Sequence, residues 1–312
     1  MKLLITRPMP APVVEAAQAF AEVEMRESNV PMSESEMKAA MWMFDAIIPT
    51  LGDGCSAGMM EGRCKLLANF GVGYNHIDVA AATAAGIAVT NTPGAVTDAT
   101  ADIALMLMLM TCRRAGEGER LVRAGQWEGW HPTQMLGLHM SGKTVGIVGM
   151  GRIGQAIAKR CHFGFGMKVV YYNRSPKEVD VPATQVPTLA DCMFAADIVV
   201  LAVPGGAETR HLIDAKALWA MRPTAHLVNI ARGDVMDEAA LIAALETRRI
   251  AGAGLDVYEF EPAVPEALKA MENVVLLPHL GTAALEVRTS MGLMAVDNVR
   301  AFAAGETLPN AI

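Results

Sequence analysis

The chain has 312 residues, which is enough for about two domains at the usual ~100–200 residues each. Its net charge is −7 and 52% of its residues are hydrophobic, so we expect a large core and no surface for nucleic acid or an anionic membrane. The five cysteines form no CxxC pair, which disfavours zinc or a disulfide framework and fits free thiols in the cytoplasm. The longest membrane-like run, Ile103 to Met110, is far short of the ~20 residues that a span needs.

Short apolar runs bounded by turn residues predict buried strands, and helix-length segments separate most of them. The first series of such runs is Leu3–Ile5, Ala46–Ile48, Lys65–Ala68 and Ile87–Val89. The second series is Thr144–Val148, Val169–Tyr172, Ile198–Leu201, His226–Ile230, Ala253–Val257 and Val274–Leu277. Strands this uniformly apolar need cover on both faces. The predicted fold class is therefore α/β, with two Rossmann-like or flavodoxin-like domains built on parallel sheets.

Two long helices are predicted at Ala99–Cys112 and Glu286–Ala304, and a glycine-containing loop precedes each of them. We expect the chain to cross between domains at these loops, Thr92-Pro93-Gly94 and Leu280-Gly281-Thr282. The first domain is then discontinuous and uses both termini. The predicted domains are residues 1–95 with 284–312, which bind the substrate, and residues 96–283, which bind a dinucleotide.

A GxGxxG turn, Gly149-Met150-Gly151-Arg152-Ile153-Gly154, follows the first strand of the second series and opens a helical stretch. A dinucleotide-binding turn requires this context. Gly149 permits the tight turn, Gly151 lets the backbone approach a pyrophosphate, and Gly154 lets helix and strand pack closely. Free N–H groups at the helix start, at Arg152 and Ile153, would bind the phosphates. An ordinary glycine turn without a ligand is the alternative.

The end of the next strand indicates which nucleotide is bound. It reads Asn173-Arg174-Ser175, at a place where an acidic residue would bind the ribose of NAD. These three residues would instead accept a 2′-phosphate, and one charge-assisted hydrogen bond is worth about 10–100-fold in affinity. NADP(H) is therefore favoured. If Arg174 is only a solvated surface charge, NAD(H) is the alternative.

Three polar side chains follow successive strands of the second series: Arg232, Glu261 and His279. Ligands bind beyond the carboxyl ends of parallel strands, so all three are expected at the same edge as the glycine turn. Arginine binds a carboxylate and polarises a carbonyl, and histidine donates a proton near neutral pH. A carboxylate beside the histidine orients its ring and favours its protonated form. The set fits reduction of a 2-keto acid and needs no metal, although each residue alone has an ordinary structural explanation.

With these residues the chain resembles the D-isomer-specific 2-hydroxyacid dehydrogenases. The matching segments, in the family's order along nearly the whole chain, are Phe70–Asp78, the glycine turn, Val203-Pro204 with Glu208–Arg210, Asn229–Gly233, Gly254–Pro262 and Pro278–Gly281. The resemblance implies that Arg232 binds substrate, His279 is the general acid and base, and Glu261 tunes His279. It implies that N–H groups near Val72 and Gly73 hold the substrate carboxylate. The further cofactor positions that it implies are Thr100, Val203, Pro204, Thr209, Ile230, Ala231, Asp256, His279 and Gly281.

Within this family, the segments Thr111–Arg114 and Gly125–Pro132 resemble the glyoxylate/hydroxypyruvate reductases, which commonly use NADPH. They imply reduction of glyoxylate or hydroxypyruvate to the D-2-hydroxy acid. Another 2-keto acid, such as pyruvate or phenylpyruvate, is an alternative, and so is a nicotinamide-sensing binding protein similar to the corepressors built on this fold. The family is usually dimeric, which implies a homodimer. Trp127 and Trp130 are expected either to shape substrate choice or to anchor a dimer arm.

Overall fold

The computed structural model describes residues 1–312, which divide into two compact units. The terminal unit comprises residues 1–96 and 282–312, and the central unit comprises residues 97–281. The domain boundaries predicted at residues 95 and 283 lie within two residues of this division.

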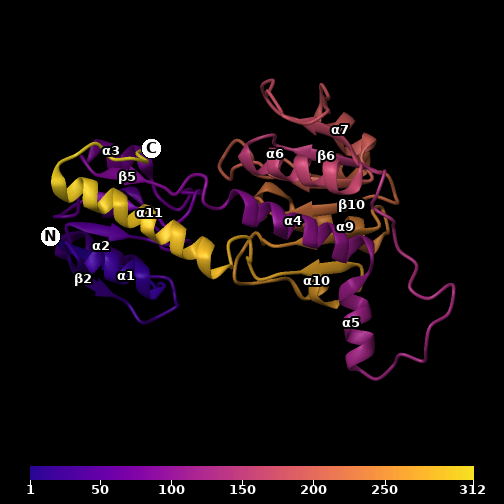
Figure 1. Ribbon diagram of the computed structural model, residues 1–312, viewed down its shortest axis with the longest axis horizontal. Helices are drawn as coiled ribbons and strands as arrows, with labels where there is room; N and C mark the ends of the chain where they lie inside the picture. The colour runs from indigo at the N-terminus through magenta and orange to yellow at the C-terminus, as the bar shows by residue number, and fades with distance from the viewer. The chain divides into compact units, whose positions relative to one another are not determined.

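The terminal unit is built on a five-stranded parallel sheet in the order β2-β1-β3-β4-β5. Its strands are β1 (Lys2–Ile5), β2 (Glu22–Met25), β3 (Ala46–Ile48), β4 (Leu66–Ala68) and β5 (Ala88–Thr90). Its helices are α1 (Ala11–Gln18), α2 (Glu34–Met43), the 3-10 turn η1 (Ala57–Met59), α3 (Val79–Ala84) and α11 (Leu285–Ala304). Figure 1 shows the yellow α11 beside the indigo N-terminal elements. A β-carbon at Gly292 of α11 would lie 2.5 Å from Val13 of α1, so glycine allows this close approach.

The central unit is built on a seven-stranded parallel sheet in the order β12-β11-β10-β9-β6-β7-β8. Its strands are β6 (Thr144–Val148), β7 (Lys168–Tyr172), β8 (Ala183–Gln185), β9 (Ile198–Leu201), β10 (His226–Asn229), β11 (Gly252–Leu255) and β12 (Val274–Leu276). Its helices are α4 (Thr97–Cys112), α5 (Ala115–Arg123), α6 (Arg152–Lys159), the π-helical turn η2 (Arg160–Gly164), α7 (Leu189–Ala195), α8 (Ala215–Ala220), the 3-10 turn η3 (Gly233–Val235), α9 (Glu238–Glu246) and α10 (Glu266–Ala270). The sequence-based fold class is confirmed.

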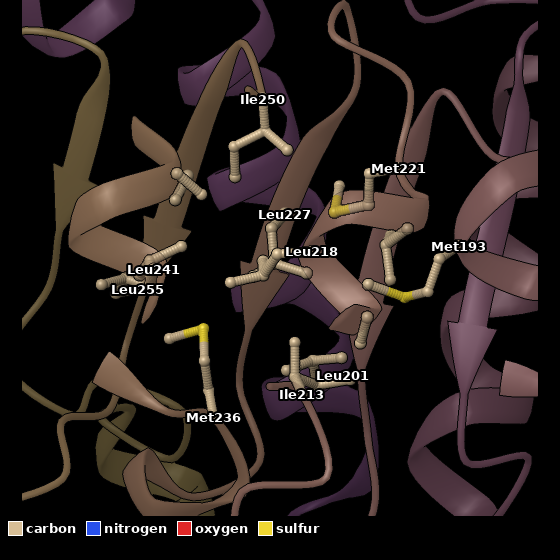
Figure 2. Packing of buried hydrophobic residues seen from close by; sticks show 14 of the residues in the cluster. Met193, Leu201, Ile213, Leu218, Met221, Leu227, Met236, Leu241, Ile250 and Leu255 are labelled. Carbon is tan, nitrogen blue, oxygen red and sulfur yellow. The ribbon is translucent and has the colours of Figure 1, made fainter. Parts of the chain in front are cut away.

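Side chains from the two faces of the central sheet enter separate hydrophobic clusters. In β9, Val199 and Leu201 join one cluster, whereas Ile198 and Val200 join the other. Figure 2 shows the first cluster, in which Leu201 and Leu227 from strands meet Leu218 and Met193 from helices. Both faces of each inner strand are therefore shielded from solvent, which explains why these strands are uniformly apolar.

The sequence pattern missed two strands, β2 and β8, and both lie at a sheet edge. Their residues, Glu22–Met25 and Ala183–Gln185, are half-buried or exposed and carry polar side chains. An edge strand faces solvent on one side and needs no continuous apolar run. The strands that were predicted have boundaries within two residues of those observed.

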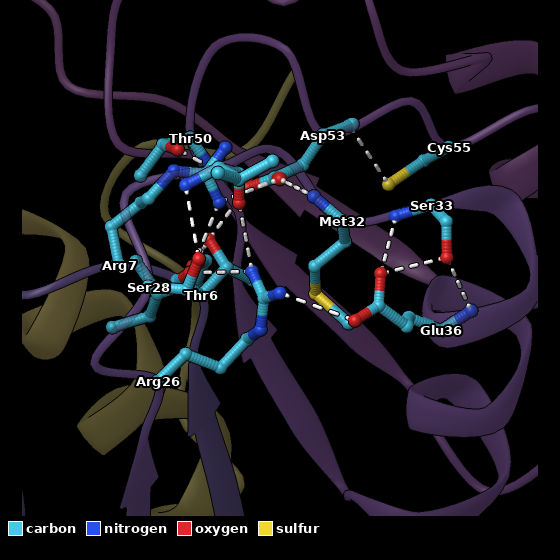
Figure 3. Close-up of polar contacts among 12 residues, drawn as sticks. Thr6, Arg7, Arg26, Ser28, Met32, Ser33, Glu36, Thr50, Asp53 and Cys55 are labelled. Atoms are coloured by element: carbon cyan, nitrogen blue, oxygen red, sulfur yellow. Dashed lines mark hydrogen bonds and ion pairs between the residues drawn. The ribbon is translucent and has the colours of Figure 1, made fainter.

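A buried carboxylate organises the loops of the terminal unit. Asp53 is fully buried and forms an ion pair of 2.9 Å with Arg7. It also accepts hydrogen bonds from the hydroxyl of Thr6 at 2.6 Å, the N–H of Met32 at 2.9 Å and the N–H of Thr50 at 3.0 Å. Figure 3 shows these groups converging on the carboxylate. Burial alone would raise the pKa of Asp53, but these donors and the charge of Arg7 lower it overall.

The five cysteines are all buried thiols, and burial raises the pKa of each of them to about 12. No helix combines the length and apolar character needed to cross a bilayer.

Candidate active site

The glycine turn lies between β6 and α6, and the space around the missing side chain differs among its three glycines. Gly149 has a φ of +99°, and a β-carbon there would lie 2.7 Å from the carbonyl oxygen of Ala202. A β-carbon at Gly154 would lie 2.1 Å from the carbonyl oxygen of Gly149, so helix and turn are in direct backbone contact. At Gly151, by contrast, a β-carbon would meet no protein atom within 4 Å. Gly151 therefore borders open space, not the core.

The start of α6 offers unpaired donors to that space. Gly151 is the residue before the helix and caps it with no side-chain hydrogen bond. The N–H groups of Arg152 and Ile153 donate to no acceptor in the protein. Unpaired N–H groups at a helix start, beside a glycine that leaves room, are the features that bind a dinucleotide pyrophosphate. The residues present thus fit the predicted cofactor.

Arg232 follows β10 in a loop that the preceding asparagine builds. Asn229 is fully buried, accepts a hydrogen bond of 3.0 Å from the N–H of Ala231 and donates one of 3.0 Å to the carbonyl of Arg232. The next residue, Gly233, is sterically required, since a β-carbon there would lie 1.8 Å from the backbone of Tyr258. Sequence reasoning gave Asn229 no role, and only its place in a family motif pointed to it.

The guanidinium of Arg232 is held in a partly buried position with spare donor capacity. Its Nη1 donates to the carbonyl of Ala231 at 2.7 Å, whereas its buried Nε has no partner. Burial lowers the pKa of this arginine, while the carboxylates of Glu261 and Asp234 raise it. Arginine remains charged under any such shift. The site thus contains a cation whose remaining donors are available to a planar anion.

Glu261 and His279, from the loops after β11 and β12, form a hydrogen-bonded pair. The Nδ1 atom of His279 lies 2.9 Å from Oε2 of Glu261, and Oε1 of Glu261 accepts the N–H of Tyr258 at 3.1 Å. Burial would raise the pKa of Glu261, but the contact with His279, the Tyr258 N–H and the charge of Arg232 lower it overall. Glu261 is therefore an anion that fixes the ring and leaves Nε2 of His279 for another partner.

The backbone of His279 is itself unusual. Its φ is +55°, in the left-handed region that non-glycine residues rarely adopt. Asp256 stabilises this conformation: its backbone carbonyl accepts the His279 N–H at 3.0 Å, and its carboxylate accepts the N–H groups of Leu280 and Gly281 at 2.6 and 2.8 Å. Thr100 closes the same loop by donating to the carbonyl of Gly281 at 3.3 Å. Burial raises the pKa of Asp256, although the two N–H donors oppose the shift.

The loop after β9 holds the predicted cofactor positions Val203, Pro204 and Thr209. The hydroxyl of Thr209 donates to the carbonyl of Pro204 at 2.7 Å and so closes this loop. A β-carbon at Gly149 would lie 2.8 Å from Cγ1 of Val203, so the loop packs against the glycine turn. Ile230 and Ala231 are buried beside Arg232. The structure thus brings these positions to the same edge as the glycine turn.

The segment Asn173-Arg174-Ser175 follows β7 beside the glycine turn. Asn173 accepts the N–H of Met150 at 3.1 Å and donates to the carbonyl of Ser175 at 2.8 Å, so both ends of its amide are already hydrogen-bonded. Arg174 is exposed and pairs with Glu208, another exposed residue. A 2′-phosphate at this position would compete with Glu208 for the guanidinium, a contact that sequence reasoning did not foresee.

Val72 and Gly73 lie in the terminal unit, in the loop after β4. Both residues are partly exposed, and their N–H groups donate to no acceptor in the protein. Paired, unsatisfied N–H groups of this kind are suited to binding an anion.

The chain is similar to known proteins over its whole length. Residues 105–281 match the model of the D-isomer specific 2-hydroxyacid dehydrogenase, NAD binding domain. Over 320 aligned residues the chain is 42% identical to a protein of Thermococcus litoralis named glyoxylate reductase, with 100% of this chain and 96% of that protein covered.

Solved structures that are similar over the full length of this chain include the following two. A protein of Thermus thermophilus superposes with a TM-score of 0.93 at 40% identity, with 100% of both chains covered. An NADPH-dependent glyoxylate/hydroxypyruvate reductase of Sinorhizobium meliloti, solved with NADP and malonate, superposes with a TM-score of 0.89 at 37% identity, with 100% of this chain and 96% of that chain covered.

The chain therefore belongs to the D-isomer specific 2-hydroxyacid dehydrogenase family, and it is an oxidoreductase with an NAD-binding domain. Its relatives include proteins named glyoxylate reductase, one of them from Pyrococcus horikoshii at 43% identity.

Proposed function

We propose that the protein reduces glyoxylate or hydroxypyruvate to the corresponding D-2-hydroxy acid, with NADPH as the preferred cofactor. The observation that carries this proposal is the hydrogen-bonded pair of Glu261 and His279, in which the Glu261 carboxylate lies close enough to Arg232 for the two charges to interact. The full-length similarity to proteins named glyoxylate reductase supports the choice of substrate.

Each residue of the proposed catalytic group has a separate task. When bound, the reduced nicotinamide supplies a hydride to the carbonyl carbon. Arg232 binds the substrate carboxylate and polarises the carbonyl oxygen. His279 donates to Glu261 through Nδ1 and delivers a proton to the carbonyl oxygen from Nε2. Glu261 accepts the Nδ1 hydrogen bond and so keeps the ring oriented. In the reverse direction, His279 accepts the hydroxyl proton.

The terminal unit contains a further anion-binding group in this proposal. The N–H groups of Val72 and Gly73 bind the substrate carboxylate. Backbone donors suit this task because they carry no side-chain entropy and bind without a permanent charge.

The preference for NADPH follows from the end of β7. Arg174 and Ser175 offer a cation and a hydroxyl where a carboxylate would repel a 2′-phosphate. Among the structural relatives, the reductase of Sinorhizobium meliloti was solved with NADP. Glu208 weakens the preference because it already pairs with Arg174. We therefore expect NADH to be used, but less efficiently.

A kinetic panel tests the proposed function directly. Purified protein is mixed with NADPH or NADH and with glyoxylate, hydroxypyruvate, pyruvate or phenylpyruvate, and the nicotinamide absorbance is followed. The highest kcat/KM is expected with NADPH and one of the first two acids. A preference for pyruvate or phenylpyruvate would leave the chemistry in place and change the substrate. NADPH binding without turnover of any acid would favour the sensing protein.

We also propose that two copies pair through the central unit. A groove lined by Leu105, Leu109 and Phe163 runs between α4 and η2, and Phe163 is 67% exposed. Figure 1 shows α5 and the following segment extending from the rest of this unit, and that segment carries the exposed Trp127 and Trp130. Exposed apolar surface of this kind marks an interface. Sedimentation should give a dimer, and Phe163→Glu should shift it to a monomer; a wild-type monomer would contradict the proposal.

A further inference from the structure

Two asparagine side chains hold the loop that follows β4 in the terminal unit. Asn69 comes directly after β4, and its Nδ2 donates to the carbonyls of Gly71 at 2.9 Å and Gly73 at 3.1 Å. Asn91 comes directly after the neighbouring strand β5, and its Nδ2 donates to the carbonyl of Val72 at 2.9 Å. Three successive carbonyls are therefore directed toward amide donors of the protein.

The direction of these carbonyls fixes the direction of the N–H groups behind them. A trans peptide unit is planar, and its C=O and N–H point in opposite directions. The peptide units whose carbonyls face the two asparagines contain the N–H groups of Val72, Gly73 and Tyr74. These three N–H groups consequently face away from the amides, and none of them donates to an acceptor in the protein. The loop therefore presents three unpaired donors whose directions are set by the two asparagines.

The surroundings of Asn69 show that this arrangement is built for its Nδ2. Asn69 is 1% exposed, and its Oδ1 is buried without a hydrogen-bond partner. A buried, unpaired oxygen is costly, so an asparagine that served only packing would be a poor choice here.

The N–H of Thr92 also donates to the carbonyl of Gly71 at 3.1 Å, and Gly71 has a φ of +151°, a conformation that favours glycine.

We infer that Asn69 and Asn91 are positioning residues for substrate recognition. Their amides hold the carbonyls of residues 71–73, so that the N–H groups of Val72, Gly73 and Tyr74 are oriented to bind the carboxylate of the 2-keto acid. This inference rests on the proposed function of the loop. Amides are suited to the task because they donate to carbonyls and carry no charge. A carboxylate at either position would accept instead of donate and would repel the substrate anion.

The test uses Asn69→Asp and Asn91→Asp, which keep the side-chain shape and remove the donors. Asn273→Asp is the matched control, because Asn273 also donates its Nδ2 to a backbone carbonyl, that of Ala251 at 3.2 Å. Asn273 directly precedes β12 and so lies at the amino ends of the strands of the central sheet, whereas Glu261 and His279 follow the carboxyl ends. For each variant, KM and kcat for glyoxylate, the Kd for NADPH, and calorimetric binding of oxalate to the NADPH-loaded protein are measured.

We expect Asn69→Asp to raise KM for glyoxylate and the Kd for oxalate by about 10–100-fold, the equivalent of one lost hydrogen bond to a charged group. The Kd for NADPH should stay unchanged, and Asn273→Asp should behave as wild type. Wild-type oxalate binding in both loop variants would overturn the inference. If Asn69→Asp does not fold, Asn91→Asp decides in the same way.

Failure of the proposed function gives a different result. If the unmodified protein turns over no 2-keto acid but binds oxalate, and the loop variants bind it more weakly, the inference stands and the reaction is wrong. If the unmodified protein neither turns over a 2-keto acid nor binds oxalate, both are wrong.

Discussion

Two loops of the molecule are held by side chains with opposite hydrogen-bonding roles. In the central unit, the carboxylate of Asp256 accepts two backbone N–H groups and fixes the loop of His279. In the terminal unit, the amides of Asn69 and Asn91 donate to three backbone carbonyls and fix the loop of Val72. A carboxylate can only accept hydrogen bonds, so it holds a loop by its N–H groups, whereas an amide can hold a loop by its carbonyls and adds no charge that would repel a bound anion. Each support thus matches the backbone groups of its own loop, and the neutral support also suits the anion that its loop is proposed to bind.

The largest expected effect comes from removing the imidazole itself. Asn is among the residues that adopt a positive φ most readily, so His279→Asn keeps the backbone of the first loop. Loss of a general acid lowers turnover by about 10²–10⁴-fold. Stopped-flow or steady-state kcat for glyoxylate measures this, with the Kd for NADPH as the control. A kcat within threefold of wild type would remove His279 from its proposed role.

Asp256→Asn removes the negative charge that holds the His279 loop and keeps the shape of the side chain. The variant loses two charge-assisted hydrogen bonds, each worth about 1.5–3 kcal/mol, so the free energy of unfolding should fall by about 3 kcal/mol. kcat should also fall, because the loop that carries His279 loosens. Urea denaturation and kinetics measure the two effects. If the neutral amide supports the loop as well as the carboxylate does, the contrast between the two loops is not electrostatic.

The two units should also differ in their response to acid. His226 of β10 is buried, and burial lowers its pKa to about 4 from 6.5. Between these values the unfolded chain binds a proton that the folded chain does not, so stability is lost as the pH falls from 6.5 toward 4. At pH 5 the loss is about 2 kcal/mol. The pKa of Asp53 in the terminal unit is lowered, so its contribution is lost only below 3.8.

Hydrogen exchange at pH 5 and pH 7 measures this difference. Amides of β10 should lose protection at pH 5, whereas amides of β1 in the terminal unit should not, and His226→Gln should remove the pH dependence. If amides of both units lost the same protection at pH 5, or if His226→Gln lost as much protection as the wild type, His226 would not be the cause of the acid sensitivity.

The smallest expected effect concerns the exposed pair of Arg174 and Glu208. Arg174→Ala should raise KM for NADPH by about tenfold, at the lower end for a charge-assisted bond because the group is exposed. Glu208→Gln should lower KM for NADPH, since it removes a competitor for the guanidinium. KM for NADH serves as the control for both variants. Equal changes for both cofactors would show that Arg174 does not bind the 2′-phosphate.

The sequence by itself determined the parts of this protein that depend on local pattern. Buried parallel strands are uniformly apolar because both faces are covered, so the sequence alone predicts ten of the strands. The glycine turn has fixed spacing, because Gly149 and Gly154 leave no room for a side chain and Gly151 leaves open space for a ligand. The placement of Arg232, Glu261 and His279 at one edge followed from chain order, since parallel strands all end on the same side.

Only the tertiary structure decided which groups support these residues. The edge strands β2 and β8 carry no apolar signal, and the roles of Asn69, Asn229 and Asp256 have no periodicity to reveal them. Asp256 acts on residues 24 and 25 positions away, and Asn91 acts on a carbonyl 19 positions away. The role of a short polar side chain depends on the backbone group that the fold places beside it. That group is decided by the order of the strands in the sheet.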